Sequence, residues 1–106
     1  MDKKRNLVKK LEKFKKNLSR EIPVEKVIFF GSRATGKEHK DSDIDLIIVS
    51  EKFKKLKFRE RSLGFYRYWN LDYPVDFLCY TPEEFEKMSK MITIVREAVK
   101  KGLEIK

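Results

Sequence analysis

VIFFGSRATGKEHKDSDIDLIIV, residues 27–49, is the stretch of sequence that decides the fold. Apolar runs rich in β-branched and aromatic residues lie at its two ends, and each run has the composition of a buried strand. Between the runs, Gly31 and Ser32 are typical of a turn, and Asp43 and Asp45 stand at the entrance of the second run. The pattern predicts two strands separated by a turn, with a pair of carboxylates where the second strand begins.

The two aspartates are expected to share one face of the second strand. Successive side chains of a strand alternate between faces, so Asp43 and Asp45 point one way, whereas Ile44 and Leu46 point the other way. Two bare carboxylates on one patch repel each other, and one of them would be driven to take up a proton unless a cation is present. Magnesium suits such a pair, because it prefers hard oxygen ligands and is commonly held by one or two carboxylates together with substrate phosphates.

The turn itself has the features of a phosphate site. Gly31 lets the backbone approach a ligand closely, and amide groups at the start of the segment 32–35 can donate to phosphate oxygens. The Ser32 hydroxyl is a further donor. The planar guanidinium of Arg33 suits a bidentate phosphate contact, but it could equally brace a neighbouring carboxylate, and both interpretations are kept. Gly36 is expected to end the segment, since glycine tolerates the left-handed conformation.

The loop between the turn and the aspartates contains weaker candidates for binding a triphosphate or a metal ion. Lys37 and Lys40 could reach a triphosphate from this loop. His39 is the sole histidine of the chain, and we interpret it as solvated because a zinc site needs three or four converging ligands. A calcium loop is excluded, because Leu46 stands where that loop requires a glycine.

The residues just described resemble a known family signature. Gly31-Ser32, ten residues, and then Asp43-Ile44-Asp45 resembles the motif of the DNA polymerase beta-like nucleotidyltransferase superfamily, and the short chain is similar to its minimal nucleotidyltransferases. That family carries a third acidic residue on a later strand. The matching position here is Asp76, within the apolar run 75–79, although Asp72 lies close by; strand alternation favours Asp76.

The resemblance implies a site and an activity. The implied catalytic and magnesium-binding residues are Asp43, Asp45 and Asp76. The implied nucleotide-binding residues are Gly31, Ser32 and Arg33. Together they would move a nucleoside monophosphate, AMP from ATP or the equivalent from another nucleoside triphosphate, to an acceptor hydroxyl. The implied acceptor is a HEPN-family toxin, which would make this chain the antitoxin of a toxin-antitoxin system. A different class of function stays open, namely a non-catalytic binding module that neutralises its partner by occlusion.

Length and charge set limits on the molecule. The chain has 106 residues, a formal net charge of +9 and a charged fraction of 41%. This length predicts a single domain over residues 1–106, and the resemblance implies that it is a nucleotidyltransferase domain. The apolar stripe Leu7, Leu11, Phe14 and Leu18 predicts an amphipathic helix whose other faces are charged. A nucleic-acid partner is allowed by the charge but not favoured, because a Lys/Glu-rich chain without glutamine matches thermal adaptation better.

The rest of the chain completes an α/β, or α+β, arrangement. We expect a helix with an aromatic stripe over 58–69, a third strand after Pro74, and a helical segment that begins at Thr81 with a capping box to Glu84 and ends at Gly102. That last segment is one helix or two. The predicted fold is a three-layer or two-layer domain, in which strands separated by helical segments favour a mixed or parallel sheet with helices on one side. By resemblance it is a small mixed sheet with helices packed on it, the polymerase beta-like nucleotidyltransferase core.

The chain shows no sign of a membrane or secreted protein. No stretch approaches the roughly twenty apolar residues of a membrane span. The lysine-rich amino terminus lacks the apolar core of a signal peptide. Cys79 is the sole cysteine, so it forms no internal disulfide and is expected to be a packed thiol. We therefore expect a cytoplasmic protein.

Overall fold

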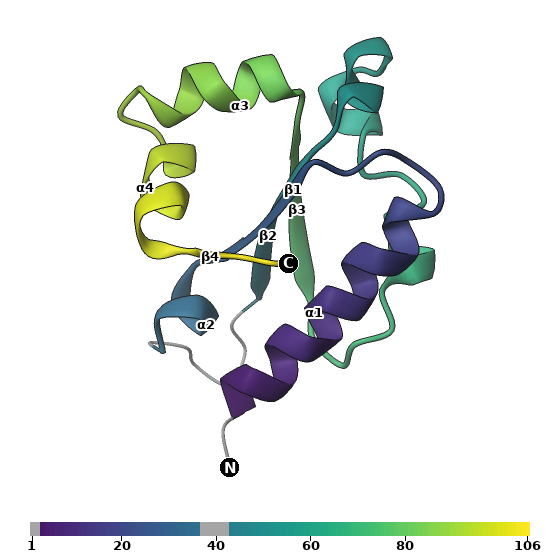
Figure 1. Cartoon of the computed structure of the whole chain (residues 1–106), viewed down its shortest axis with the longest axis vertical. Helices are drawn as coiled ribbons and strands as arrows, with labels where there is room; N and C mark the ends of the chain where they lie inside the picture. Colours follow the sequence, from purple (N-terminus) through teal and green to yellow (C-terminus); the bar gives the residue numbers. More distant parts are fainter. Residues whose placement is uncertain (1–2, 37–42) are drawn as a thin grey trace.

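A four-stranded mixed sheet runs through the centre of the molecule (Figure 1). The computed structural model describes residues 3–36 and 43–106, without the side chains of four of these: Lys3, Lys4, Ser32 and Thr35. The strands are β1 (Lys26–Phe30), β2 (Ile44–Val49), β3 (Val75–Tyr80) and β4 (Leu103–Glu104). In space they follow the order β3-β2-β1-β4. β1 is antiparallel to both β2 and β4, whereas β2 and β3 are parallel, so the predicted mixed sheet is confirmed.

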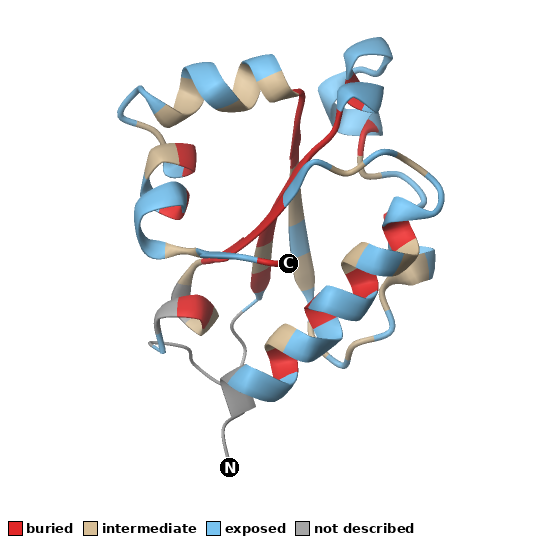
Figure 2. Ribbon diagram, viewed as in Figure 1, coloured by how far each residue is buried: buried red, intermediate tan, exposed pale blue. Residues whose placement is uncertain are grey.

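Helices cover both faces of the sheet, which corrects the expectation that they lie on one side. The α-helices are α1 (Lys3–Ser19), α2 (Ser32–Thr35), α3 (Pro82–Ser89) and α4 (Ile94–Lys101). α1 lies on one face, and α3 and α4 lie on the other (Figure 1). The reason is the composition of the central strands: β1 and β2 are buried at nearly every position, as Figure 2 shows, so both of their faces need a cover.

The α1 face of the sheet carries the larger core. The predicted stripe of α1 is confirmed, because its four residues are all buried: Leu7, Leu11, Phe14 and Leu18. The ring of Phe14 is 2% exposed and meets two aromatic neighbours, with centroids 5.3 Å from Trp69 and 5.7 Å from Phe77. Such aromatic pairs add to the free energy of burial. Most of the buried apolar side chains therefore lie between α1 and the sheet.

The α4 face of the sheet carries a smaller cluster. Its buried members come from the sheet and from α4: Ile28, Phe30, Ile47, Val49, Tyr80, Val95 and Ala98. The predicted capping box is confirmed, since the Glu84 amide donates to Thr81 Oγ1 at 3.2 Å and the Thr81 amide donates to Glu84 Oε1 at 2.9 Å. The helical segment is divided in two, because Thr93 caps a new helix, and that helix ends at Gly102 as predicted.

An ion pair ties the segment before β3 to α3. The Arg61 guanidinium is 8% exposed and donates to both carboxylate oxygens of Glu84, at 2.6 and 3.2 Å, and to the carbonyl of Cys79 at 3.1 Å. These hydrogen bonds lower the pKa of Glu84. Because the pair is bidentate and its cation is buried, it fixes the geometry of this corner more firmly than an exposed pair would.

The predicted helix over 58–69 was wrong. The chain forms two short 3-10 helices there, η2 (Phe58–Glu60) and η3 (Phe65–Tyr68), after a first one, η1 (Glu51–Lys55). Between η2 and η3, Gly64 adopts a left-handed φ of 86° that an α-helix cannot accommodate. The aromatic stripe is consequently split: Phe65 is buried, whereas Phe58 is 53% exposed.

Two smaller expectations can also be checked. Within residues 3–36 and 43–106, the structure contains no helix that is both long and apolar enough for a bilayer. Cys79 is a buried thiol, as expected, and burial raises its pKa to about 12. A thiol with this pKa stays protonated at neutral pH, so Cys79 is a packing residue and not a nucleophile.

Candidate functional site

Two of the candidate acids lie side by side in neighbouring strands. The parallel register of β2 and β3 pairs Asp45 directly with Asp76. Both residues alternate with side chains of the α1 face, so both carboxylates belong to the α4 face. Asp72, the alternative to Asp76, is an exposed residue before β3. The register therefore selects Asp76 as the neighbour of Asp45.

Asp43 lies just outside the strand that was predicted to include it. β2 begins at Ile44, whose amide donates to the Pro74 carbonyl at 2.8 Å. The parallel ladder cannot extend one residue further, because its next partner would be Pro74, which has no N–H to donate. Asp43 is exposed at this edge. Its negative charge still acts on Asp45 and contributes to the raised pKa of that acid.

Asp45 is the acid whose pKa is perturbed at this edge of the sheet. Burial raises the pKa of the half-buried Asp45, and the negative charges of Asp76 and Asp43 raise it further. A carboxylate in this position is held among like charges with part of its solvent removed. The arrangement thus creates the electrostatic demand for a cation that the sequence pattern predicted, and it concentrates that demand on Asp45.

Gly31 brings the backbone of the turn against this acid. Its φ is 87°, and a Cβ placed there would overlap Oδ2 of Asp45 and lie 3.1 Å from its Cγ. α2 begins immediately afterwards, and buried Ala34 anchors it to the core of the α1 face. Gly36, with a φ of 79°, ends the segment as predicted. The side chain of Ser32 lies outside the described part of the structure, so its role as a donor stays a prediction.

Arg33 has an aromatic partner that neither sequence interpretation included. Its guanidinium lies 4.6 Å from the ring centroid of Tyr73, a cation–π distance. The Tyr73 carbonyl in turn accepts a hydrogen bond of 2.9 Å from the indole of Trp69. Arg33 is therefore held on the aromatic layer that packs on the α1 face. The candidates Lys37, His39 and Lys40 lie outside the described residues.

A hollow of about 310 Å³ adjoins Asp45 and Gly31, and we call it the α4 hollow. Its lining residues come from the turn, β2 and α4: Phe30, Gly31, Asp45, Ile94, Glu97, Ala98 and Lys101. Glu97 and Lys101 form an ion pair of 3.2 Å. Sequence reasoning missed both residues, because a Glu and a Lys four positions apart are an ordinary pair on a helix surface. Only the docking of α4 beside the turn reveals their place.

The acids fit a hard divalent cation in chemistry. Their oxygens are the ligands that Mg²⁺ prefers. Because Gly31 has no side chain, it does not cover the Asp45 carboxylate, which a Cβ at this position would overlap. Among the described residues, no group of three or more histidine, cysteine, aspartate or glutamate side chains is gathered so as to hold a metal by itself. Asp43, Asp45 and Asp76, the three predicted metal ligands, are thus not gathered into such a group, and their role as ligands stays a prediction.

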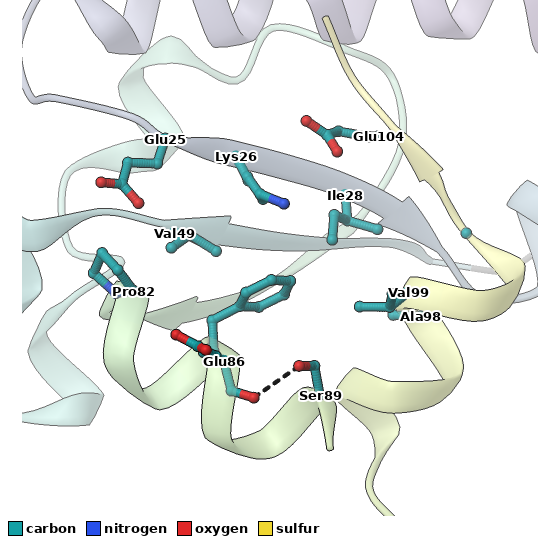
Figure 3. Close-up of a pocket in the computed structure, with 12 residues that line it drawn as sticks. Glu25, Lys26, Ile28, Val49, Pro82, Glu86, Ser89, Ala98, Val99 and Glu104 are labelled. Atoms are coloured by element: carbon teal, nitrogen blue, oxygen red, sulfur yellow. Dashed lines mark hydrogen bonds between the residues drawn. The ribbon is translucent and has the colours of Figure 1, made fainter. Parts of the chain in front are cut away.

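A second hollow lies on the same face of the sheet. It measures about 470 Å³, lies between the sheet, α3 and α4, and is called the α3 hollow below. Figure 3 shows Lys26, Ile28 and Val49 projecting into it from the strands, opposite α3. None of the three acids lines it. The α4 hollow is therefore the one nearer the candidate residues, because Asp45 and Gly31 both line it.

Comparison with known proteins gives consistent matches. Residues 11–101 match the family described as the nucleotidyltransferase domain. The probable protein adenylyltransferase MntA of Haemophilus influenzae is 33% identical over 85 residues, which are 78% of this chain and 75% of that protein.

Solved structures agree with this match at the level of the fold. A crystal structure of an inferred nucleotidyltransferase from Sulfolobus solfataricus superimposes with a TM-score of 0.65 at 22% identity, over 95% of this chain and 80% of the other. A second inferred nucleotidyltransferase gives a TM-score of 0.51 at 25% identity, over 77% of this chain and 89% of the other.

Proposed function

The chain belongs to the nucleotidyltransferase domain family, as a minimal nucleotidyltransferase, and from this premise we propose that it transfers AMP from ATP to a hydroxyl group of a partner protein. The family makes it a transferase that uses a nucleoside triphosphate and a divalent metal. The proposal is carried by one observation: Asp45 is paired in register with Asp76, and the Gly31 backbone abuts the Asp45 carboxylate. Acids for metal ions and a turn for phosphates thus share one place.

Each group has a distinct task in the proposed reaction. Asp43, Asp45 and Asp76 would hold Mg²⁺. The metal, when bound, would neutralise charge on the triphosphate and on the attacking and leaving oxygens. The amides after Gly31 and the Ser32 hydroxyl would orient the phosphates. Asp76 would also accept the proton of the attacking hydroxyl, because it is the exposed member of the strand pair. Positioning and charge neutralisation supply most of the catalysis in such a displacement.

The bond changes follow from in-line attack at the α-phosphorus. The acceptor oxygen forms a bond to that phosphorus, and the bond between the α-phosphorus and the oxygen that bridges to the β-phosphate breaks. The acceptor proton passes to Asp76, and the bridging oxygen leaves as part of pyrophosphate. AMP therefore becomes joined to the acceptor through a phosphodiester, and only the α-phosphate of ATP stays on the product.

The proposed acceptor is a tyrosine hydroxyl of a HEPN-family toxin, so that the chain acts as an antitoxin. Support comes from the likeness to a relative that is named a protein adenylyltransferase. The paired acids also support catalysis over a purely occluding role, since burying one carboxylate among like charges brings no benefit to simple binding. ATP and Mg²⁺ are cytoplasmic reagents, and the cytoplasm is the proposed location.

Labelled ATP tests this function. The full chain is incubated with Mg²⁺, a candidate HEPN partner, and ATP labelled in either its α- or its γ-phosphate. We expect label on the partner from α-labelled ATP alone, and we expect Asp43→Asn to abolish it while Asp72→Asn does not. Label from γ-labelled ATP would mean phosphoryl transfer. Partner inhibition that survives Asp43→Asn without any label would support occlusion and would overturn the catalytic proposal.

A further inference from the structure

One stripe of α4 faces the candidate site. Ile94, Glu97, Ala98 and Lys101 follow helical spacing, and all four line the α4 hollow together with Gly31 and Asp45. Ala98 is buried at the base of the stripe, and its small side chain lets the helix approach the sheet. Lys101, at the last turn of α4, is followed directly by Gly102 and by β4, which pairs with β1 beside the phosphate turn. The helix therefore forms a wall of the hollow.

Lys101 is the one cation among the described residues that line this hollow. Its nearest ionic partner is Glu97, 3.2 Å away, and the two side chains are 71% and 59% exposed. An ion pair this exposed holds its partners weakly, so the ammonium group is available to a stronger anion. Among the described residues, Arg33 is a further cation of the turn, and its guanidinium packs on Tyr73.

The charge of the proposed substrate makes this placement significant. A nucleoside triphosphate brings several negative charges to a place that already holds Asp45 among like charges. Metal ions offset part of that charge, and a lysine acts as a compact point charge for phosphate oxygens. The hollow supplies such a lysine, because Lys101 lines it together with Gly31 and Asp45.

We propose that the α4 stripe is part of the nucleoside triphosphate site. In this site Lys101 leaves Glu97 and binds the β- and γ-phosphates, which depart as pyrophosphate. The apolar members of the hollow, Phe30, Ile94 and Ala98, give the nucleoside a non-polar surface to rest on. Ile94 is 55% exposed without such a ligand. This inference rests on the proposed function, because it assigns Lys101 to the same substrate.

The chain offers a matched control for Lys101. Lys100 is its neighbour in the last turn of α4, is exposed, and does not line the hollow. Replacing either lysine by alanine removes one positive charge and one favourable interaction with the helix dipole. Any difference in ATP affinity between Lys101→Ala and Lys100→Ala therefore comes from the position of Lys101 in the hollow. Thermal unfolding of both variants verifies that they fold.

Equilibrium titration of the full chain with ATP and Mg²⁺, followed by calorimetry, is the test. We expect Lys101→Ala to raise the Kd for ATP by about tenfold or more, as loss of a charge-assisted hydrogen bond does. Lys100→Ala should change it less than about twofold. Adenosine, which has no phosphates, should bind both variants alike. Lys101→Arg should retain most of the affinity, and Glu97→Gln should tighten ATP binding, because it frees the lysine.

The outcomes separate this inference from the proposed function. Equal Kd values for Lys101→Ala and Lys100→Ala overturn the role of Lys101, even if label transfer to a partner is observed. A selective loss of ATP affinity in Lys101→Ala supports it, even if no acceptor is ever labelled. Absence of ATP binding by the unaltered chain contradicts the inference outright, since no triphosphate site would then exist.

Discussion

The two faces of the sheet differ in how completely they are filled. On the α1 face, large aromatic and aliphatic side chains interlock, and the ring of Phe77 alone meets four other aromatic rings. On the α4 face, a smaller cluster leaves two hollows of about 470 and 310 Å³. Asp45 and Asp76, the two acids paired in register, belong to the α4 face. The molecule thus separates the residues that hold the fold from the candidate site residues.

This separation has a physical cost and a benefit. Acids that lie among like charges lower the free energy of unfolding, and so do hollows that leave apolar side chains without neighbours. Both are tolerable only if the other face is well packed. The α1 face supplies that packing. Substitutions on the two faces should consequently have opposite profiles, with stability affected on one face and substrate handling on the other.

The largest expected effect on stability comes from the α1 face. Phe14→Ala should lower the free energy of unfolding by about 3–5 kcal/mol, because it removes a buried ring and leaves a cavity. Phe85→Ala, its counterpart beside the α3 hollow, should cost only about 1–2 kcal/mol, since that ring is only partly buried. Urea unfolding measures both. Equal losses would break the distinction between the faces.

The acids should show the reverse profile. Asp45→Asn should lower the rate of nucleotide transfer by at least about 10²–10³-fold, the scale of losing one group that stabilises transition-state charge. Its free energy of unfolding should stay the same or increase, because a carboxylate among like charges is removed. Asp72→Asn is the control and should alter neither quantity. Loss of stability in Asp45→Asn would show that this acid is structural.

Two glycines sharpen the comparison further. Gly31 and Gly36 both have left-handed φ angles, so replacing either by alanine should cost about 1–2 kcal/mol of stability. Only at Gly31 would the new Cβ overlap the Asp45 carboxylate, whereas at Gly36 it would meet nothing within 4 Å. Transfer activity should therefore fall in Gly31→Ala and persist in Gly36→Ala. Similar activity in the two variants would show that the close approach of Gly31 to Asp45 does not matter for transfer.

The smallest expected effect is a pair of opposite pH dependences. The pKa of Asp45 is raised above 3.8 by burial and by its acidic neighbours, so its contribution to stability is fully present below 3.8 and is lost as pH rises through the raised pKa. The pKa of Glu84 is lowered from 4.5, chiefly by the hydrogen bond from Arg61, so its contribution is present above 4.5 and is lost as pH falls through the lowered pKa.

Unfolding free energies of Asp45→Asn and Glu84→Gln, measured from about pH 3 to 7, test these signs. Relative to the unaltered chain, Asp45→Asn should gain stability as pH rises. Glu84→Gln should lose stability as pH rises, because Arg61 is buried and then lacks a charged partner. Parallel curves for the two variants would refute the assignment of opposite environments.

The sequence predicted those features that depend on local patterns. The stripe of α1, the strands on either side of Gly31, the Thr81 capping box and the helix end at Gly102 all follow from spacing or from the chemistry of one residue. The approach of Asp76 to Asp45 was expected from family resemblance, and the parallel register of β2 and β3 provides it.

The features that the sequence did not predict depend on packing between distant segments. The 58–69 stripe looked helical, but Gly64 and the reach of Arg61 to Glu84 divide it into 3-10 helices. β4 has two residues and exists only because the chain after α4 returns to β1. Lys101 carries no signal of its own, since its closeness to Gly31 arises from how α4 docks.

One measurement tests the division between the faces most directly. Backbone amide NMR signals of the full chain are followed while ATP and Mg²⁺ are added. The account predicts that the changes concentrate at Gly31, Asp45, Asp76 and Lys101, with little change at Leu11 and Phe14 on the α1 face. Changes that concentrate on α1, or around the α3 hollow with the acids unaffected, would contradict it.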